Sequence, residues 1–447
     1  MTPPSPNTAN AEAAVTVVGG GLAGCEAAYQ LLRAGLRVRL LEQRPASMTP
    51  AHSGGRLAEL VCSNSFRSDR LSAAPGLLKA EMRLLGSLII AAADRTSLPA
   101  GQALAVDRER FAAEVEAELA SRPGFELVRR EVKSVPHEGP VIVATGPLTA
   151  GAFAEDLARL VGAGYLHFYD AVAPIVVADT VDQSLCYLAS RYGKGGADYL
   201  NCPLDREQYL ALLAALREAE QYPARPFEDE RFFEGCLPVE EMARRGDDVL
   251  RFGPLKPVGL PDPSTGAEPY AVLQLRQDDL AAEHFNLVGF QTRMREGEQK
   301  RVIRLVPALH RAGFARLGRM HRNTYINSPA VLEATWQVRG RPLLFVAGQL
   351  SGIEGYVESA ASGLAAGLYA AQLLRGDAIE PLPATTAIGA LGRYVAGADP
   401  EHFQPMNVTF GLLDGEDLPR RPRRRRRQAQ AERALEHVKE WARRRDK

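Results

Sequence analysis

The N-terminal part of the chain alternates short apolar runs with one stretch of helical periodicity. An apolar run over 14–18 is followed by a glycine-rich turn, by apolar positions at helical spacing through Leu32, and by a second apolar run over 36–41. Short apolar runs bounded by turn residues are typical of buried strands, whereas helical spacing predicts a helix packed on them. The order strand, helix, strand is that of a βαβ unit with parallel strands.

The glycine-rich turn has the spacing of a dinucleotide-binding loop, Gly19-Gly20-Gly21-Leu22-Ala23-Gly24. In such a loop the first glycine makes the tight turn, the second lets the backbone approach a pyrophosphate, and the third lets the helix pack closely on the strand. Glu42 ends the second strand 18 residues after Gly24, where a carboxylate meets a ribose hydroxyl. The pattern therefore predicts an α/β fold, a Rossmann-like parallel sheet with a bound dinucleotide.

Further strands that end near a glycine occur in both halves of the chain. The predicted elements are a helix over 108–119, strands over 125–128, 141–143 and 342–346, and a helix of small residues over 356–374. The strand at 143 leads into Ala144-Thr145-Gly146, an ending that recurs in two-dinucleotide flavoproteins, and the strand at 346 leads to Gly348 and Gln349. A turn of this kind directs helix N-terminal amides at a ligand, here a flavin ring.

Strands at both ends predict a single cofactor domain that is discontinuous in sequence. The predicted division is a disordered leader over 1–14, a two-dinucleotide-type FAD-binding domain over 15–159 and 331–419, an inserted α+β substrate domain over 160–330, and a basic tail over 420–447. Helices are predicted in the insertion over 206–218 and 298–306. The length of 447 residues fits two or three domains at about 150 residues each.

Charge is balanced over the whole chain but not along it. Lys and Arg total 54, as do Asp and Glu, which argues against a uniformly basic surface that binds nucleic acid nonspecifically. Residues 420–447 nevertheless hold 13 Lys and Arg against 4 Asp and Glu, with an unbroken arginine run over 423–427. Two interpretations stay open for this tail: a phosphate-binding arm, or a solvated and partly frayed terminus.

Cysteine usage and hydropathy favour a cytoplasmic protein. The five cysteines are odd in number and have no CxxC spacing, so they predict neither a disulfide framework nor a metal site. No apolar stretch reaches the roughly 18 residues that span a bilayer, and the first residues lack the pattern of a signal peptide. Cys25, on the helix after Gly24, is predicted to be a packing residue, and Cys186 and Cys202 have no predicted role.

Several long strings resemble the TrmFO family of folate- and FAD-dependent tRNA (uracil-5-)-methyltransferases. They are Cys62-Ser63-Asn64-Ser65-Phe66 after Glu59, Phe233-Glu234-Gly235-Cys236-Leu237-Pro238, Gly253-Pro254-Leu255-Lys256-Pro257-Val258-Gly259, the segment 320–329 and the segment 348–356. The resemblance covers nearly the whole chain. It departs from the family pattern at Phe66, where an aliphatic residue is expected, and in the density of arginines in the tail.

The resemblance implies a reductive methylation of carbon 5 of the T-loop uridine in tRNA. 5,10-Methylenetetrahydrofolate would supply the one-carbon unit, and NAD(P)H would supply reducing equivalents through FAD. Because carbon 5 of uracil is a poor nucleophile, a thiolate adds to carbon 6 first. The resemblance assigns Cys62 and Cys236 to this chemistry, one as nucleophile and the other as redox or proton-transfer partner, and leaves their order open. The sequence predicts neither an oligomeric state nor a choice between NADH and NADPH.

The same strings imply folate or tRNA contacts at Lys256, His321, Arg322 and Asn323. The basic residues within 293–304 predict either a groove for tRNA phosphates or a charged solvated face. Two alternative functions stay open: a wobble-uridine modification like that of the related flavoprotein MnmG (GidA), which has a longer chain, and a non-catalytic flavin-binding RNA chaperone.

Overall fold

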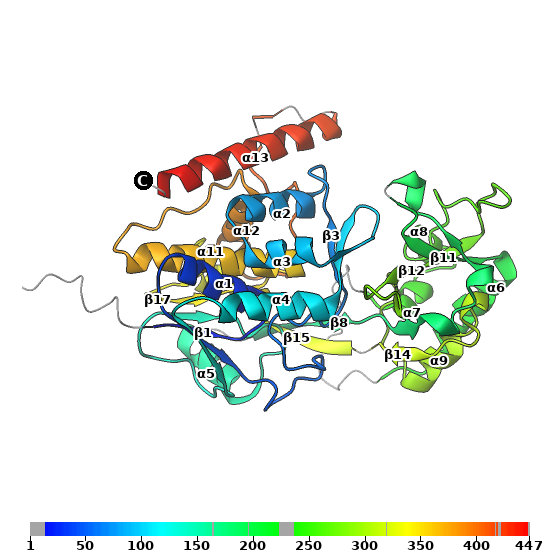
Figure 1. The fold of residues 1–447 in the computed structure, drawn as a ribbon, viewed down its shortest axis with the longest axis horizontal. Coiled ribbons are helices and arrows are strands. Elements are labelled where there is room, and N and C mark those ends of the chain that lie inside the picture. Colours follow the sequence, from blue (N-terminus) through cyan, green and yellow to red (C-terminus); the bar gives the residue numbers. More distant parts are fainter. Residues whose placement is uncertain are drawn as a thin grey trace, which may run out of the picture.

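The structure is a computed structural model that describes residues 14–162, 165–194, 196–222, 237–318, 320–415, 417–418 and 422–445, with backbone alone over 165–171 and 320–322. Two lobes lie side by side along the long axis (Figure 1). Each lobe has its own buried apolar cluster. The larger lobe contains both the beginning and the end of the described chain.

A six-stranded sheet forms the centre of the larger lobe, in the order β16-β17-β7-β1-β2-β6. The strands are β1 (Val15–Val18), β2 (Val38–Glu42), β6 (Phe125–Arg129), β7 (Val141–Val143), β16 (Gln337–Val338) and β17 (Arg341–Val346). All pairs from β17 to β6 are parallel, and β1 lies between β2 and β7. The sheet thus has the predicted Rossmann-like arrangement, with the glycine turn following the central strand β1.

Two helices that pack on this sheet cross each other very closely. They are α1 (Leu22–Arg33) and α11 (Tyr356–Leu374). A Cβ atom added to Gly363 would lie 2.1 Å from the carbonyl oxygen of Ala23, and one added to Gly367 would lie 2.8 Å from that of Ala27. The small residues of α11 therefore allow backbone contact between two helices that are more than 300 residues apart in sequence.

Helices and a small sheet complete the larger lobe. They are α2 (Ala74–Leu84), α3 (Leu88–Arg95), α4 (Arg108–Ala120), α5 (Gly151–Val161), α10 (Ser328–Val331), α12 (Ala387–Gly397), and the sheet of β3 (Ser65–Ser68), β5 (Ala103–Val106) and β4 (Ser97–Leu98). Lys79 of α2 is fully buried and donates to the carbonyl oxygens of Phe66 and Ser68. Phe66 packs against the rings of Phe111 and Tyr356, which accounts for an aromatic residue at this position.

The smaller lobe is built on a second six-stranded sheet, in the order β10-β11-β12-β13-β9-β14. Its strands are β9 (Ile175–Val177), β10 (Tyr187–Leu188), β11 (Tyr199–Leu204), β12 (Ala271–Gln277), β13 (His284–Leu287) and β14 (Phe314–Arg316). Its helices are α6 (Arg206–Glu218), α7 (Val239–Arg244), α8 (Val249–Phe252) and α9 (Glu296–Ile303). A two-stranded ladder of β8 (Tyr165–Ala171) and β15 (Met320–Ile326) runs between the lobes.

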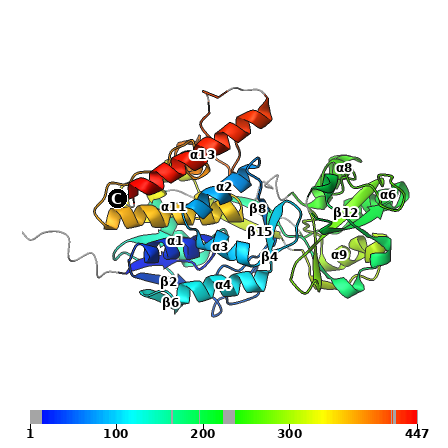
Figure 2. The same ribbon diagram turned by 45° about the horizontal axis from the view of Figure 1, so that its top comes forward.

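The C-terminal segment is a docked helix, α13 (Arg423–Arg445), and not a frayed terminus. Its buried face carries Ala431, Ala434, Val438 and Trp441, at helical spacing. The Trp441 indole nitrogen donates to the carbonyl oxygen of Glu380, and its ring lies edge-on to Tyr369. In Figure 2 the helix lies along α2 and α11. The sequence has a helix-compatible pattern over 431–445, but the arginines interleaved with its apolar positions gave no prediction that this helix docks on the larger lobe.

Candidate active site

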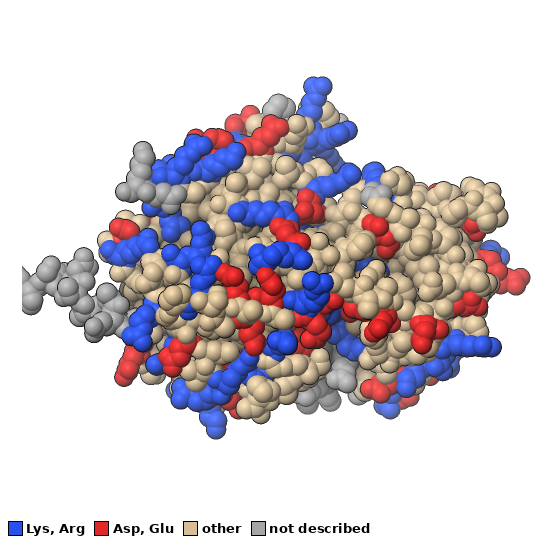
Figure 3. All heavy atoms as spheres, in the orientation of Figure 1, with Lys and Arg blue, Asp and Glu red and all other residues tan. Residues whose placement is uncertain are grey.

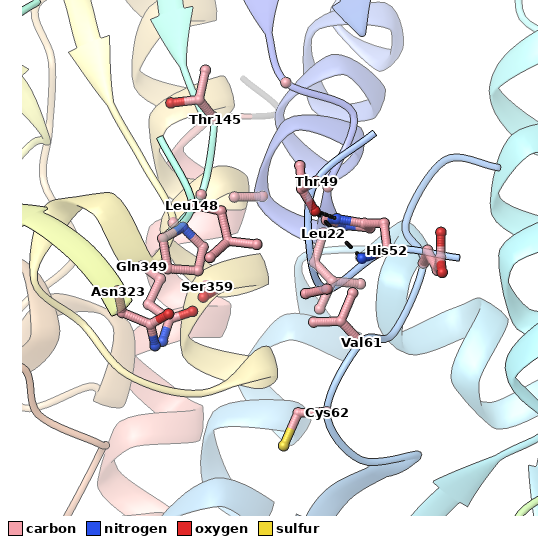
Figure 4. Close-up of a pocket in the computed structure, with 18 of the residues that line it drawn as sticks. Leu22, Thr49, His52, Val61, Cys62, Thr145, Leu148, Asn323, Gln349 and Ser359 are labelled. Carbon is pink, nitrogen blue, oxygen red and sulfur yellow. Dashed lines mark hydrogen bonds between the residues drawn. The ribbon is translucent and has the colours of Figure 1, made fainter. Parts of the chain in front are cut away.

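A cavity with a volume of about 700 Å³ lies where the two lobes meet. It begins at the carboxyl ends of β1 and β7, where open α/β sheets bind their ligands, and extends to the Cys62 loop. In Figure 4, Thr145, Asn323 and Gln349 lie on one side of this cavity, and Val61 and Cys62 lie on the other. One continuous space therefore joins the predicted dinucleotide loop to a predicted catalytic thiol.

The glycine loop at the start of α1 has the geometry that a pyrophosphate requires. Gly19 has φ +104° and passes so close to Ala144 that a Cβ atom would lie 2.4 Å from the Ala144 carbonyl oxygen. A Cβ atom on Gly24 would lie 1.8 Å from the Gly19 carbonyl oxygen. Gly21 lines the cavity, and a Cβ atom there would meet no atom within 4 Å. Gly24 thus serves packing, whereas Gly21 leaves room for a ligand near the first amides of α1.

Glu42 lies beside this loop at the end of β2, and its side chain is buried, with 5% of the residue exposed. One carboxylate oxygen accepts a hydrogen bond of 2.7 Å from the Gly20 amide, and the other accepts from Arg44. Burial favours the neutral carboxyl, but the hydrogen bonds and charge of Arg44 outweigh it and hold the pKa of Glu42 below its ordinary value. Glu42 is therefore an ionised acceptor that also lines the cavity, as a ribose hydroxyl needs.

The opposite wall comes from the second and third glycine turns. Thr145 and Gly146 follow β7, Gly348 and Gln349 follow β17, and all four line the cavity. Gly348 has φ +78°, which turns the chain after the strand. The Gln349 amide donates to Glu354, so its orientation is fixed by the protein. These turns and the glycine loop form one cradle large enough for a dinucleotide, and the residues present fit FAD.

Cys62 lies on a loop that is held from three directions. Its amide donates to the Tyr356 hydroxyl at 2.7 Å, and its carbonyl oxygen accepts from Arg108 at 3.3 Å and from Arg316 at 3.0 Å. Tyr356 begins α11 and Arg108 begins α4, while Arg316 ends β14 in the smaller lobe. Burial, and next the negative charge of a Cys62 thiolate, raise the pKa of Tyr356, so this hydroxyl stays neutral.

The neighbouring contacts join the same loop to the smaller lobe. Arg276 donates to the Ser63 hydroxyl at 2.8 Å and to the Asn64 side chain at 3.0 Å. Asp278 forms an ion pair of 3.0 Å with Arg108. Three guanidinium groups, of which two belong to the smaller lobe, thus surround the loop of Cys62. Positive charge of this kind stabilises a thiolate, which is the nucleophilic form of cysteine.

The other predicted site residues differ in whether they line the cavity. Asn323 is buried and lines the cavity. Lys256 is not among the residues that line it, and its carbonyl oxygen accepts from Arg191. Cys236 and the side chains of His321 and Arg322 lie outside the described residues. Cys25 is fully buried, and its burial raises the pKa of the thiol, in agreement with the predicted packing role.

The basic segment 293–304 makes internal contacts rather than a clear phosphate groove. Arg293 is 8% exposed and pairs with Glu241, Arg295 pairs with Glu220, and Arg301 pairs with Glu298. Arg304 donates to the carbonyl oxygen of Ala312. Of the two interpretations of this segment, these contacts favour a charged solvated face over a groove for tRNA phosphates.

Sequence reasoning missed the residues that hold the Cys62 loop. Tyr356 ends one of the family strings, so its position carried a signal, but Arg108, Arg276 and Arg316 stand in stretches with no motif. They contact the loop only because the two lobes are packed against each other. Arginines scattered over more than 200 residues give no local signal of this kind.

A substitution that removes the Arg316 contacts should lower activity without unfolding the protein. We expect Arg316→Gln to lower kcat by about tenfold to a hundredfold, because the Cys62 carbonyl loses a donor and the thiolate loses a nearby cation. The rate of Cys62 alkylation by iodoacetamide should fall in parallel. Arg301→Gln, at a surface ion pair, is the matched control and should change neither rate. An unchanged alkylation rate in Arg316→Gln would contradict this positioning role.

Comparisons with known proteins agree with this fold. The family model described as Glucose inhibited division protein A matches residues 14–378. A crystal structure of Aquifex aeolicus GidA superposes with a TM-score of 0.71 at 17% identity, covering 97% of this chain and 74% of that one. Fold and cavity thus define a flavoprotein of the GidA-like FAD-binding class.

Within that class, the curated relatives give the family. The methylenetetrahydrofolate–tRNA-(uracil-5-)-methyltransferase TrmFO of Moorella thermoacetica is 56% identical over 426 residues, covering 94% of this chain and 97% of the relative. The TrmFO of Solibacter usitatus is 54% identical, covering 96% of this chain and 98% of the relative. The chain belongs to the TrmFO family.

Two further findings concern what the described parts of the chain contain. None of the helices found there combines the length and the apolar character needed to cross a bilayer. Nor do those residues include a group of three or more His, Cys, Asp and Glu side chains arranged to hold a metal ion.

Proposed function

We propose that this protein methylates carbon 5 of the T-loop uridine in tRNA, with the one-carbon unit from 5,10-methylenetetrahydrofolate and reducing equivalents from NAD(P)H through FAD. Relatives named for this reaction that are more than 50% identical over nearly the whole chain support the activity. The observation that carries the mechanism is that the Cys62 loop and the dinucleotide loop line one cavity. A tRNA substrate also supports a cytoplasmic location.

The chemistry of this chain begins with the Cys62 thiolate. Its addition to carbon 6 of the uracil makes carbon 5 nucleophilic. Carbon 5 then forms a bond to the methylene carbon while the bond from that carbon to the nitrogen that carries it breaks. Arg108, Arg316 and Tyr356 hold the loop while the thiolate attacks and leaves. Cys236 is the proposed partner that takes the proton from carbon 5. The reverse order of the two cysteines is the alternative.

The proposed cofactor site is the cradle formed by the three glycine turns that line one cavity. We assign FAD to Gly19, Gly20, Gly21, Leu22, Ala23, Glu42, Thr145, Gly146, Gly348 and Gln349. Gly24 supports them by packing against Gly19. When bound and reduced, the flavin supplies the reducing equivalents that convert a methylene group into a methyl group. Asn323 lines the same cavity and is the proposed contact to folate or tRNA, and Lys256, His321 and Arg322 stay folate or tRNA contacts predicted from the sequence.

The tRNA would contact the protein through the arginine run at the start of α13. Arg423, Arg424 and Arg425 are exposed, and Figure 3 shows basic side chains gathered at this end of the helix. The preceding loop contains Asn407, which lines the cavity, and Phe410, which stacks under Arg427. The loop that contains Asn407 thus leads from the cavity to the N-terminal end of α13, where the arginine run begins. A stacked uridine would still have to be extruded to reach Cys62.

Neutralising part of the run tests this contact without removing the helix. We expect Arg424→Gln with Arg425→Gln to weaken tRNA binding by about tenfold at physiological salt and to lower the salt slope by about one to two. Arg443→Gln with Arg444→Gln removes equal charge from the other end of α13 and should have less effect. Equal binding curves for both double variants would contradict the assignment. Deletion of 420–447 is unsuitable, because it would expose the pocket that Trp441 fills.

The overall reaction is tested with an unmodified tRNA transcript and FAD. Label carried by methylenetetrahydrofolate should appear in 5-methyluridine, and label carried by S-adenosylmethionine should not. Running NADH and NADPH separately determines the reductant. Transfer from neither donor by folded, flavin-loaded protein would overturn the proposal and favour the MnmG-like alternative. A non-catalytic chaperone would keep its function without Cys62 and Cys236, so loss of methyl transfer in a folded variant that lacks these cysteines would contradict the chaperone alternative.

A further inference from the structure

Two cysteines outside the proposed active site lie next to each other in the smaller lobe. The Sγ atoms of Cys186 and Cys202 are 3.6 Å apart. Cys202 is fully buried in β11, and Cys186 directly precedes β10 with its side chain partly exposed. Neither residue lines the cavity that holds Cys62.

The backbone brings the two residues into direct opposition. Tyr187 pairs with Asn201 and Leu188 pairs with Leu200, so Cys186 faces Cys202 one position further along the same antiparallel register. Cys186 is itself extended, with φ −124° and ψ 166°. The ladder hydrogen bond from Ala189 to Tyr199 makes 189 and 199 a bonded pair, and the alternation of antiparallel ladders then makes 186 and 202 a non-bonded pair.

This type of pair suits a disulfide. Opposed Cα atoms in a non-hydrogen-bonded pair are about 4.5 Å apart, and disulfides join Cα atoms that are about 4.4 to 6.8 Å apart. The sulfur atoms need only approach each other by side-chain rotation, while the strands keep their register. The sequence alone could not reveal this pairing, because the two cysteines lie 16 positions apart and belong to no known motif.

We propose that Cys186 and Cys202 form a reversible disulfide when the protein meets a peroxide. In the first step the Cys186 thiolate attacks one oxygen of hydrogen peroxide, which gives a sulfenic acid on Cys186 and releases hydroxide. In the second step the Cys202 sulfur attacks that sulfenic acid, which forms the sulfur–sulfur bond and releases a second hydroxide, and the two thiol protons convert both to water. Two thiols are oxidised, one peroxide is reduced, and a dithiol reverses the change.

The order of the two steps follows from the surroundings of each thiol. A hydrogen bond from the Cys202 thiol lowers the pKa of Cys186, against the opposing effects of burial and of Asp182. The same hydrogen bond, together with burial, raises the pKa of Cys202. Cys186 is thus the more acidic and the more accessible sulfur, as the first attacking group requires. Cys202 is then already within reach as the resolving thiol.

The disulfide would act on a strand that contacts the larger lobe. Tyr199 at the start of β11 donates to the carbonyl oxygen of Ala100, and Asp198 just before it accepts from the Gly101 amide. A covalent link across β10 and β11 would close the segment between the two cysteines and hold it in place. We expect oxidation to raise the melting temperature of the full-length protein by a few degrees, since the unfolded chain becomes constrained.

The test treats full-length, FAD-loaded protein with hydrogen peroxide, blocks remaining thiols with iodoacetamide, and maps peptides by mass spectrometry. The expected result is a linked peptide pair containing Cys186 and Cys202, about 2 Da lighter than the two reduced peptides together. The link should disappear on treatment with dithiothreitol and should not form in Cys186→Ser.

If Cys202→Ser fails to fold, Cys186→Ser still tests the proposal, because Cys186 is only partly buried and its replacement should leave the fold intact. In peroxide-treated Cys186→Ser, the Cys202 thiol should be recovered alkylated after unfolding, and the rise in melting temperature should be lost. Recovery of both cysteines as alkylated thiols from treated wild-type protein, or a link of either one to Cys62, would overturn the proposal. The proposal is independent of the proposed methyl transfer.

Discussion

Replacing Cys62 with serine is expected to lower kcat for methyl transfer by at least about a thousandfold, while the purified protein keeps its FAD. A serine hydroxyl is a far weaker nucleophile near neutral pH than a thiolate. The loop that carries it should keep its shape, because Arg316 and Tyr356 bind the backbone of residue 62 and not its side chain. The measurement is single-turnover transfer of labelled methyl groups to tRNA, together with the flavin absorbance of the protein.

Cys186→Ser is the matched control for this experiment, because it removes a partly exposed thiol that lies outside the cavity. It should keep full activity under reducing conditions. Cys236→Ser completes the set and determines the order of the two predicted cysteines: the variant that still forms a covalent complex with tRNA retains the nucleophile. Activity near the wild-type level in Cys62→Ser would contradict every role for Cys62 in the reaction.

Substitutions in the glycine loop should separate cofactor binding from folding. We expect Gly21→Ala to weaken FAD binding by about tenfold to a hundredfold with little change in the melting temperature of the apoprotein, because its methyl group enters only cavity space. Gly24→Ala should instead lower the melting temperature strongly, since its Cβ atom would lie 1.8 Å from the Gly19 carbonyl oxygen. Flavin fluorescence titration and thermal unfolding of apoprotein measure the two effects.

Gly297→Ala is the control, since a Cβ atom there also meets no atom within 4 Å, but the residue lies in α9, outside the cavity. It should bind FAD normally and be as stable as the wild type or slightly more so. If Gly21→Ala bound FAD as tightly as Gly297→Ala does, the pyrophosphate would lie elsewhere in the cavity.

Much of the larger lobe could be predicted because its signals are local. The glycine loop occupies six consecutive residues, and its strand, helix and acidic residue follow in order, so periodicity and spacing predicted β1, α1 and β2 nearly as the structure has them. The helix at 206–218 was also predicted with its observed bounds, and in the structure an Asp205 capping box marks its start. In contrast, the pattern over 431–445 is helix-compatible but did not predict that α13 docks on the larger lobe, because its apolar positions are interleaved with arginines.

The sequence by itself determined the dinucleotide loop, the family strings and the identity of Cys62 as a candidate nucleophile, because each depends on residues that are neighbours in the chain. Only the tertiary structure decided what surrounds them. Arg316 lies 254 residues from Cys62 and contacts its carbonyl oxygen through the packing of two lobes. Cys186 and Cys202 face each other only through the register of β10 and β11. Such contacts depend on long-range packing, which leaves no periodic or local trace in a single sequence.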